Sequence, residues 1–225
     1  MIPPDGDPQT GHNPERARQR WQFVPAAGQA PLIVAGLSGG RLGVIEPGAP
    51  GVHTSPMRGI DHTRRLHALT LDGTPVQRLA LDGPQVNQVA DAALVLLAAD
   101  AFGGARRVLD LCLRHVQDRE QYGRPLAGFQ AIRHQLANMA TQVEPCRALW
   151  WHAAAEGSSS AAALAKAQCA EVFLQAARDG VELHGGIGFT WEHDMHIWLK
   201  RALFDMAWAG DATLHRLRHA DLAGW

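Results

Sequence analysis

Two short stretches of the chain combine residue types that could bind an anionic ligand. In residues 119–123 (REQYG), Arg119 could hold a diphosphate through paired hydrogen bonds. In residues 185–188 (GGIG), glycines let the backbone approach a ligand closely, and a following helix offers free N–H donors. Taken alone, the first stretch is better explained as a solvated interhelical loop and the second as a glycine-capped helix end. No strand precedes the glycines, which argues against a dinucleotide-binding fingerprint.

The cysteines and histidines do not follow a metal-binding pattern. Cys112, Cys146 and Cys169 are far apart, and each lies in an apolar helical stretch, which indicates free core thiols in a reducing compartment. The sequence contains no CxxC pair. Three histidines are close in sequence, but their spacing is not that of a zinc site: His184, His193 and His196. We therefore predict no metal centre.

The C-terminal part of the chain has the apolar periodicity of helices that would position both stretches. From Val89 onward, apolar residues recur at helical spacing. The expected N-cap of the third helix is Ser160, and Gly103-Gly104 is an expected weak point of the first. Short connections between helices favour an antiparallel four-helix-type bundle. The predicted helices cover residues 86–116, 129–156, 161–184, 193–207 and 211–223.

The preceding region has the pattern of a small β-unit. Short apolar runs alternate with turn signals, and Asp72-Gly73 is expected to close the last strand. The predicted strands cover residues 21–24, 31–36, 42–45 and 66–71, with room for about five strands in all. The fold class is therefore α+β and mostly α. We divide the chain into a disordered lead (1–20), a partial antiparallel β-domain (21–85) and a helical bundle (86–225).

The composition excludes several classes of function. The formal net charge is -1, which argues against a broad nucleic-acid-binding surface. The N-terminus has no apolar region typical of a signal peptide. The longest apolar stretch, residues 92–102, contains Asp100 and is too short to span a bilayer. A soluble cytoplasmic protein is the expectation.

Taken together, the motifs resemble the acyl-CoA dehydrogenase family. The resemblance lies in residues 118–130 (DREQYGRPLAGFQ) and 182–201 (ELHGGIGFTWEHDMHIWLKR), which occur in the family's order and separation. It extends more loosely through the strand region and covers residues 21–222. It implies a middle β-domain and a C-terminal four-helix bundle, without the family's N-terminal helical domain and the opening part of the β-domain.

The resemblance also implies an FAD site. Arg119 and Gln121 match residues that reach the FAD of a neighbouring subunit, and Gln130 matches a residue near the adenine. The glycines that let the backbone approach the adenine side match Gly185 and Gly186. One residue departs from the pattern: Glu182 stands where the family usually has Gln, and a carboxylate cannot donate a hydrogen bond to a phosphate.

The residues at the family's catalytic positions depart further. The family removes the α-proton of an acyl-CoA with a Glu, and Ala209 occupies the matching position. Some members place this base on the first helix of the bundle, where the matching residue is Ala93. Since an alanine cannot accept a proton, this chain is predicted to lack the base. Two nearby acids, Asp211 and Glu192, are the candidate substitutes.

Three hypotheses follow from these matches. The favoured one is a non-catalytic subunit that completes an FAD site in a hetero-oligomer, as in family members that act on sterol side chains. The second is an active enzyme with a relocated base, and the third is a truncated structural bundle without flavin. The expected partner is another acyl-CoA dehydrogenase chain, in a hetero-oligomer or a homo-oligomer. An acyl-CoA is the expected substrate of the first two. Asp91 matches a substrate-contacting acid, although the family's Arg three residues later is Leu94 here.

Overall fold

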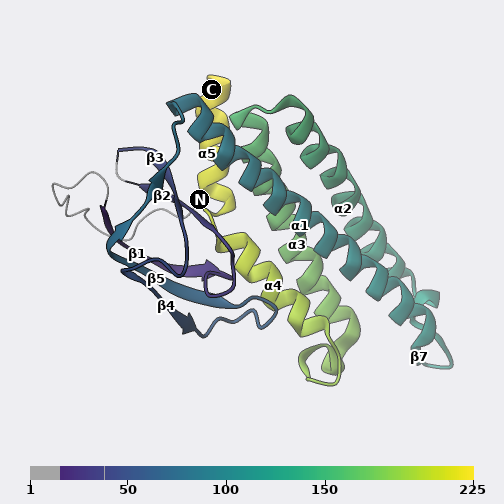
Figure 1. Ribbon diagram of the computed structural model, residues 1–225. Helices are drawn as coiled ribbons and strands as arrows, with labels where there is room; N and C mark the ends of the chain where they lie inside the picture. Colours follow the sequence, from purple (N-terminus) through teal and green to yellow (C-terminus); the bar gives the residue numbers. More distant parts are fainter. Residues whose placement is uncertain (1–15, 38) are drawn as a thin grey trace. The chain divides into compact units, whose positions relative to one another are not determined.

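The computed structural model describes residues 16–37 and 39–225, which form two compact units (Figure 1). One contains small antiparallel sheets and ends at Ala90, and the other, Asp91–Trp225, is helical. The first helix runs across the boundary between them. The predicted class, a mostly helical α+β fold with an antiparallel β part followed by a bundle, is confirmed.

The β-unit contains two three-stranded antiparallel sheets, ordered β1-β5-β4 and β2-β3-β6. Trp21 of β1 pairs with Leu69 of β5, and both side chains are buried with Ile45 of β3 in one apolar core. The strands are β1 (Arg16–Pro25), β2 (Ile33–Leu37), β3 (Arg41–Ile45), β4 (Val52–Met57), β5 (Leu66–Pro75) and β6 (Gln77–Arg78).

Strands β1 and β5 both extend further than predicted at one end of their antiparallel pair. β1 begins at Arg16, inside the lead predicted as disordered; residues 1–15 of that lead lie outside the described part of the chain. Backbone pairing with β5 forms this polar end of the strand. β5 runs past Asp72 because Gly73, with φ of +62°, is an extra residue opposite the Ala17/Arg18 step. The Asp-Gly pair therefore makes a β-bulge, and the predicted turn there is wrong.

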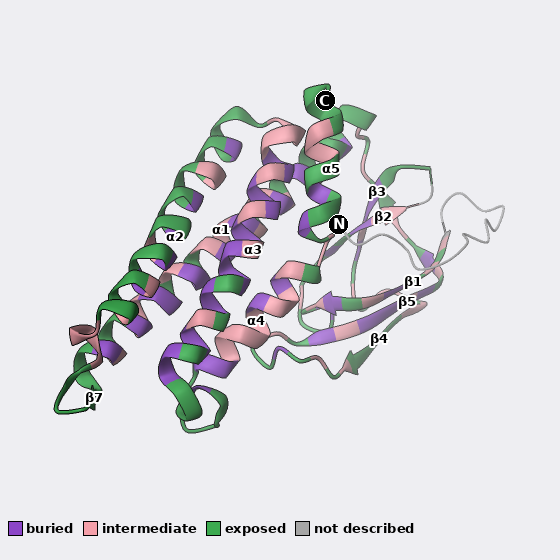
Figure 2. Ribbon diagram, turned by 180° about the vertical axis from the view of Figure 1, so that it is seen from behind, coloured by how far each residue is buried: buried purple, intermediate pink, exposed green. Residues whose placement is uncertain are grey.

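The helical unit is arranged around α3 (Ser159–His184), which packs against α2 (Gln130–Glu156), α4 (Met195–Ala207) and α5 (Ala212–Ala223). Buried residues, purple in Figure 2, occur along nearly the whole length of this helix. Only Gly157 and Ser158 separate α2 from α3, so these two helices are antiparallel neighbours. The N-cap of α3 is Ser158, whose hydroxyl accepts from the Ala161 N–H at 3.1 Å, and not the predicted Ser160.

The first helix, α1 (Gly83–Asp118), begins earlier and is more regular than predicted. Asp82 and Gln85 exchange backbone-to-side-chain hydrogen bonds of 3.0 and 2.9 Å, which caps its start. The helix continues through Gly103-Gly104. At Gly104, a Cβ would lie 2.4 Å from Cζ of Phe173, so the glycine admits an aromatic ring from α3. The predicted weak point is a packing contact.

The same helix is long and apolar enough, by length and composition alone, to cross a membrane. It is the one described helix with this property. One such helix is weak evidence, because core helices of soluble proteins share it, and Ala98, Ala101 and Val108 of α1 are buried in the bundle core.

Candidate functional site

The segment after α1 forms a tight hairpin that carries two of the predicted site residues. β7 (Glu120–Gln121) pairs with β8 (Arg124–Pro125), and the central residues Tyr122 and Gly123 have φ of +54° and +75°. Two positive φ values are typical of a type I′ turn, which matches the twist of a hairpin. The Leu126 N–H donates to the Arg119 carbonyl at 2.8 Å and closes the loop. Arg119 and Gln121 therefore lie on a short, stiff element with exposed side chains.

The next predicted residue, Gln130, is exposed at the start of α2. The N-cap residue of this helix is Phe129, whose side chain makes no capping hydrogen bond, and the first turn contains no acidic residue. The N-terminus of α2 therefore keeps the partial positive charge of an uncapped helix.

The glycine pair ends α3. Gly185 has φ of +63°, and its N–H donates to the carbonyls of Val181 and Glu182. A Cβ at Gly185 or Gly186 would meet no atom within 4 Å, so the space in front of this backbone is open. By contrast, a Cβ at Gly188 would lie 2.8 Å from the Val181 carbonyl oxygen. The pair thus leaves its backbone unobstructed, while Gly188 is required by packing.

Two contacts bring the hairpin and the glycine pair to the same end of the bundle. The rings of His115 in α1 and His184 in α3 stack with centroids 4.1 Å apart. The Gln135 side chain of α2 donates to the Glu182 carboxylate of α3 at 3.3 Å. We call the group 119–130 and 182–186 the hairpin end; in Figure 1 it includes β7 and the turn between α3 and α4.

The Glu182 contact bears on the departure seen in the sequence. The carboxylate accepts a hydrogen bond from Gln135, so α2 provides it with a partner. The side chain remains exposed, where water screens its charge. At this position the carboxylate is thus bound by α2 and exposed to solvent.

His184 is the titratable group of this end that burial changes most. The residue is 6% exposed, and its ring lies between the rings of His115 and His193. Its Nδ1 atom is 2.7 Å from the Gly180 carbonyl oxygen. Burial lowers the pKa of His184 to about 4, although the hydrogen bond to Gly180 acts in the opposite direction. Burial also lowers the pKa of His115. At neutral pH the buried imidazole of His184 beside the glycines is therefore uncharged.

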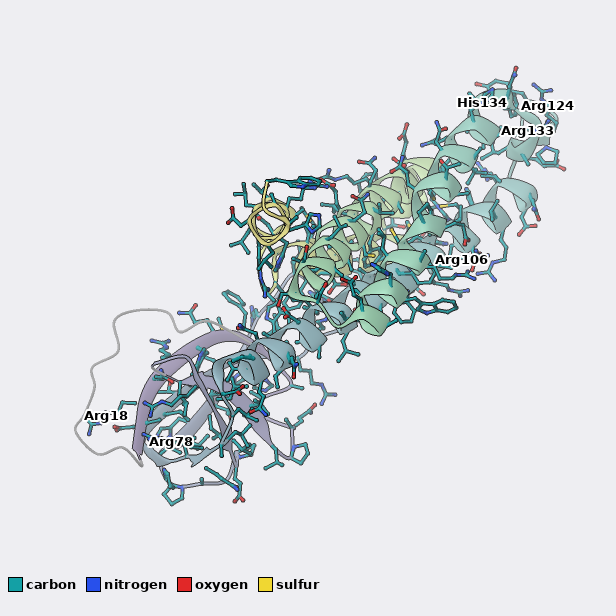
Figure 3. All side chains as sticks on the ribbon, turned by 90° about the horizontal axis from the view of Figure 1, so that it is seen from above. Arg18, Arg78, Arg106, Arg124, Arg133 and His134 are labelled. Atoms are coloured by element: carbon teal, nitrogen blue, oxygen red, sulfur yellow. The ribbon has the colours of Figure 1, made fainter. Side chains whose placement is uncertain are left out.

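Two further cationic side chains, Arg124 and Arg133, and the side chain of His134 lie at this end and were not predicted. Figure 3 shows Arg124, Arg133 and His134 together at the far end of the bundle. The Arg124 guanidinium lies 4.1 Å from the centroid of the Phe129 ring, and Nε of Arg133 donates to the Ala127 carbonyl at 2.6 Å. Their signal in the sequence is basic residues on both sides of Gln130.

The predicted base position lies on the turn between α4 and α5. Ala209 and Gly210 have φ of +61° and +101°. The Asp211 carboxylate accepts from the Leu214 N–H at 2.8 Å and is the N-cap of α5. Glu192 is exposed before the start of α4, at the opposite end of that helix, and Ala93 is half-buried on α1. The structure does not bring the two candidate acids together.

Asp91, the predicted substrate-contacting acid, is 5% exposed and bound within the bundle. One carboxylate oxygen accepts from the Ser159 hydroxyl, and the other from Arg218 of α5 at 2.7 Å. Its side chain therefore links α1, α3 and α5. No group of three or more potential metal-ligating side chains was found in residues 16–37 and 39–225.

Two buried side chains at the α4–α5 turn were not predicted at all. Lys166 of α3 donates to the Asp205 and Gly210 carbonyls, and His215 of α5 lies 2.9 Å from the Ala209 carbonyl oxygen. We call residues 208–211 with these contacts the pinned turn. The alanine-rich stretch around Lys166 is the signal for its burial, since a lysine amid apolar helix positions must find carbonyl partners inside.

Comparison with known proteins identifies relatives for most of the chain. The family model described as "Acyl-CoA dehydrogenase, C-terminal domain" matches residues 87–222. Acyl-CoA dehydrogenase IpdE2 of Mycobacterium tuberculosis is 39% identical over 147 residues, covering 65% of this chain and 44% of that protein. Acyl-CoA dehydrogenase FadE34 of the same organism is 35% identical over 166 residues, covering 71% and 23%. The chain thus spans less than half the length of these relatives.

Solved structures match both units of the chain. A structure described as an electron transferring flavoprotein of Acidaminococcus fermentans has a TM-score of 0.84 at 25% sequence identity. The match covers 94% of this chain and 62% of the chain in that structure. The Tcur3481-Tcur3483 steroid ACAD has a TM-score of 0.83 at 28% identity, with 94% and 61% covered.

Proposed function

The chain belongs to the acyl-CoA dehydrogenase family, and we propose that it is a subunit that contributes part of an FAD site without supplying the catalytic base. One observation carries this proposal. The residues matched to FAD binding lie together and exposed at the hairpin end, whereas the residues matched to the base are Ala209 and Ala93.

The hairpin end fits the diphosphate and adenine side of the cofactor. Arg119 is exposed on a stiff hairpin, and a guanidinium suits a diphosphate because it donates two hydrogen bonds in parallel. Open space lies in front of Gly185 and Gly186, so a bulky ligand can approach that backbone. Arg124 and Arg133 add positive charge nearby.

In this proposal the chain binds and orients the cofactor, and another chain removes the α-proton of the acyl-CoA. FAD, when bound, supplies the acceptor for the hydride that leaves the acyl-CoA. Arg119, Gln121 and Gln130 bind its polar side, and Gly185 and Gly186 admit it. Ala209 offers no proton acceptor, so the base must come from a second polypeptide. A relative whose name joins two designations, Tcur3481-Tcur3483, supports a hetero-oligomer of this kind.

The contacts at the α4–α5 turn give no support to a relocated base. Asp211 is already the cap of α5, and a carboxylate that accepts a backbone N–H is held at the helix end. Glu192 lies at the other end of α4, a helix of 13 residues, which is about 20 Å of rise from the Ala209 turn. A base must be within hydrogen-bond reach of the proton that it removes.

The substrate class that fits the proposal is an acyl-CoA thioester, and one similar solved structure points to steroid-derived acyl chains. The similar solved structure is described as a steroid ACAD. We therefore expect the assembled enzyme to oxidise the acyl-CoA of a sterol side chain or a fatty acid.

The test is an absorbance spectrum of the chain purified alone and after co-expression with a full-length homologous dehydrogenase chain. Bound flavin absorbs near ~450 nm because the isoalloxazine ring is oxidised. Flavin only in the co-expressed sample supports a shared site. Flavin in neither sample refutes the cofactor proposal and favours a structural bundle. A yellow chain that is bleached by acyl-CoA on its own would show that it has its own base.

A further inference from the structure

The turn between α4 and α5 is held in place at each of three successive residues. The Ala209 carbonyl is bound by His215 of α5 at 2.9 Å, and the Gly210 carbonyl by Lys166 of α3 at 3.0 Å. The Asp211 carboxylate accepts from the Leu214 N–H at 2.8 Å. A four-residue connection can reverse the chain between two helices without any of these interactions. The presence of three of them therefore requires an explanation.

The conformation they hold is one that the residues themselves disfavour. Ala209 has φ of +61°, and a non-glycine residue in this region is strained. Gly210 follows with φ of +101°. A Cβ there would lie 2.9 Å from both Nε2 of His215 and Cδ2 of Leu214, so only glycine fits. Strain of this kind persists where surrounding contacts determine the conformation, and it is typical of functional sites.

The Lys166 contact is also costly. The side chain is 0% exposed, and its ammonium group also donates to the Asp205 carbonyl at 2.9 Å, in the last turn of α4. Burial lowers the pKa of Lys166 to about 8, although Asp205 and Asp211 act in the opposite direction. A buried ammonium is unfavourable unless it is fully hydrogen-bonded. The bundle thus accepts a buried lysine in order to join the end of α4 to the turn.

We infer that Lys166 and His215 are positioning residues: acting through the pinned turn, they hold residue 209 in one orientation toward the bound acyl-CoA. This inference rests on the proposed function for the identity of the ligand, while the fixed geometry is a property of the chain alone. In a subunit without a base, the turn still sets the shape of the wall against which the thioester binds. A mobile turn would leave that wall undefined, and the substrate would bind less tightly.

The geometric part is tested on the chain alone by hydrogen exchange of the backbone amides. His215→Phe removes the donor to the Ala209 carbonyl, whereas His215→Gln keeps an N–H at a similar reach. We expect His215→Phe to raise the exchange rates of the turn and the first turn of α5 by about tenfold, as for one lost buried hydrogen bond. His215→Gln should restore them. Exchange in α2 should not change with either variant.

The lysine has a matched control, because Lys200 is the only other lysine in the chain. Lys166→Met keeps the length of the side chain and removes its donors. It should accelerate exchange at the turn by about tenfold or more, since two hydrogen bonds are lost. Lys200→Met, in α4, should leave the turn unchanged. Equal exchange in His215→Phe and His215→Gln, or in Lys166→Met and Lys200→Met, would overturn the inference.

The functional part is tested on the co-expressed complex with saturated acyl-CoA thioesters of short, long and steroid side chains. His215→Phe should raise KM by about tenfold and change kcat less, because the base on the partner is intact. His215→Gln should restore KM, which a loss of stability alone would not produce. Flavin and turnover present with unchanged KM would refute positioning. Absence of flavin would refute the proposed function instead, and the exchange result would still decide the geometry.

Discussion

The hairpin end lies at the C-terminus of α3, and the pinned turn contacts the same helix at Lys166. The two regions differ in which of the residues matched to function are present. Gly185 is 19 residues from Lys166, roughly 28 Å of helix. At the hairpin end the residues matched to FAD binding are exposed, and Arg119 and Gln121 are attached to a short hairpin. At the pinned turn the supporting contacts are present, but the residue they hold is an alanine. The residues matched to cofactor binding and the residue matched to the catalytic base therefore lie in separate parts of one bundle.

The largest expected effect comes from adding a carboxylate to the pinned turn. Ala209 already has positive φ, so Ala209→Glu adds no backbone strain that the alanine lacks. In a complex whose partner has its catalytic glutamate replaced by glutamine, Ala209→Glu should restore acyl-CoA oxidation by about 10²-fold or more. Ala207→Glu, at the exposed end of α4, is the control and should restore nothing. No recovery would show that the turn does not face the substrate.

The second effect concerns the hairpin end. Arg119→Ala should lower the flavin retained by the co-expressed complex at least about tenfold, because a charge-assisted pair with phosphate is lost. Arg114→Ala, also exposed but on the body of α1, should retain it. Absorbance per mole of purified complex measures the result. Equal flavin retention in the two variants would show that the cofactor does not bind at the hairpin.

The two ends should also respond in different pH windows. The pKa of His184 is about 4 in the folded chain, against 6.5 for a free imidazole. Between these values the unfolded chain binds a proton that the native one does not, so stability falls as the pH drops from 6.5 toward 4. For Lys166, with values of about 8 and 10.5, stability rises over that interval as the pH increases.

Urea unfolding at a series of pH values measures both effects, each up to roughly 3 kcal/mol. His184→Phe should reduce the pH dependence of the free energy of unfolding between pH 4 and 6.5 and leave that between pH 8 and 10.5 unchanged. Lys166→Met should do the reverse. Identical profiles for the two variants would contradict the assignment of one pH interval to each end.

The smallest effect tests the packing that holds both ends in one bundle. Gly104→Ala should destabilise the protein by about 1–3 kcal/mol, because its Cβ would overlap the Phe173 ring. Gly103→Ala, where a Cβ meets nothing within 4 Å, should stabilise it by about 0.5–1 kcal/mol. Urea unfolding should give changes in the free energy of unfolding of opposite sign for the two variants. Changes of the same sign would refute the packing role of Gly104.

The sequence predicts the helices better than the strands, for physical reasons. Apolar periodicity locates α1 to α5 because each helix buries a continuous face. The exposed strand β4 has no such alternation, and β6 has only two residues, so neither was predicted. At Gly73 the same glycine is compatible with a turn or a bulge, and only pairing with β1 decides between them.

The candidate site follows the same rule. Arg119 and the glycine pair could be selected because residues 118–130 and 182–201 together resemble the family's motifs, although each stretch taken alone is explained as a loop or a helix end. Lys166 and His215 could not, since their roles depend on carbonyls that are 39 to 44 and 6 residues away in the chain. Whether the selected residues bind FAD remains the prediction tested above.

The buried thiols of the bundle offer a way to observe its opening. Cys112, Cys146 and Cys169 are all the cysteines of the chain, and all are buried. Burial raises the pKa of Cys112 to about 12, so its thiolate is scarce at neutral pH. A thiol reagent can therefore label the chain only when α1, α2 and α3 separate. The rate of labelling would report how often the bundle opens, and a slower rate after co-expression would measure how firmly a partner chain closes it.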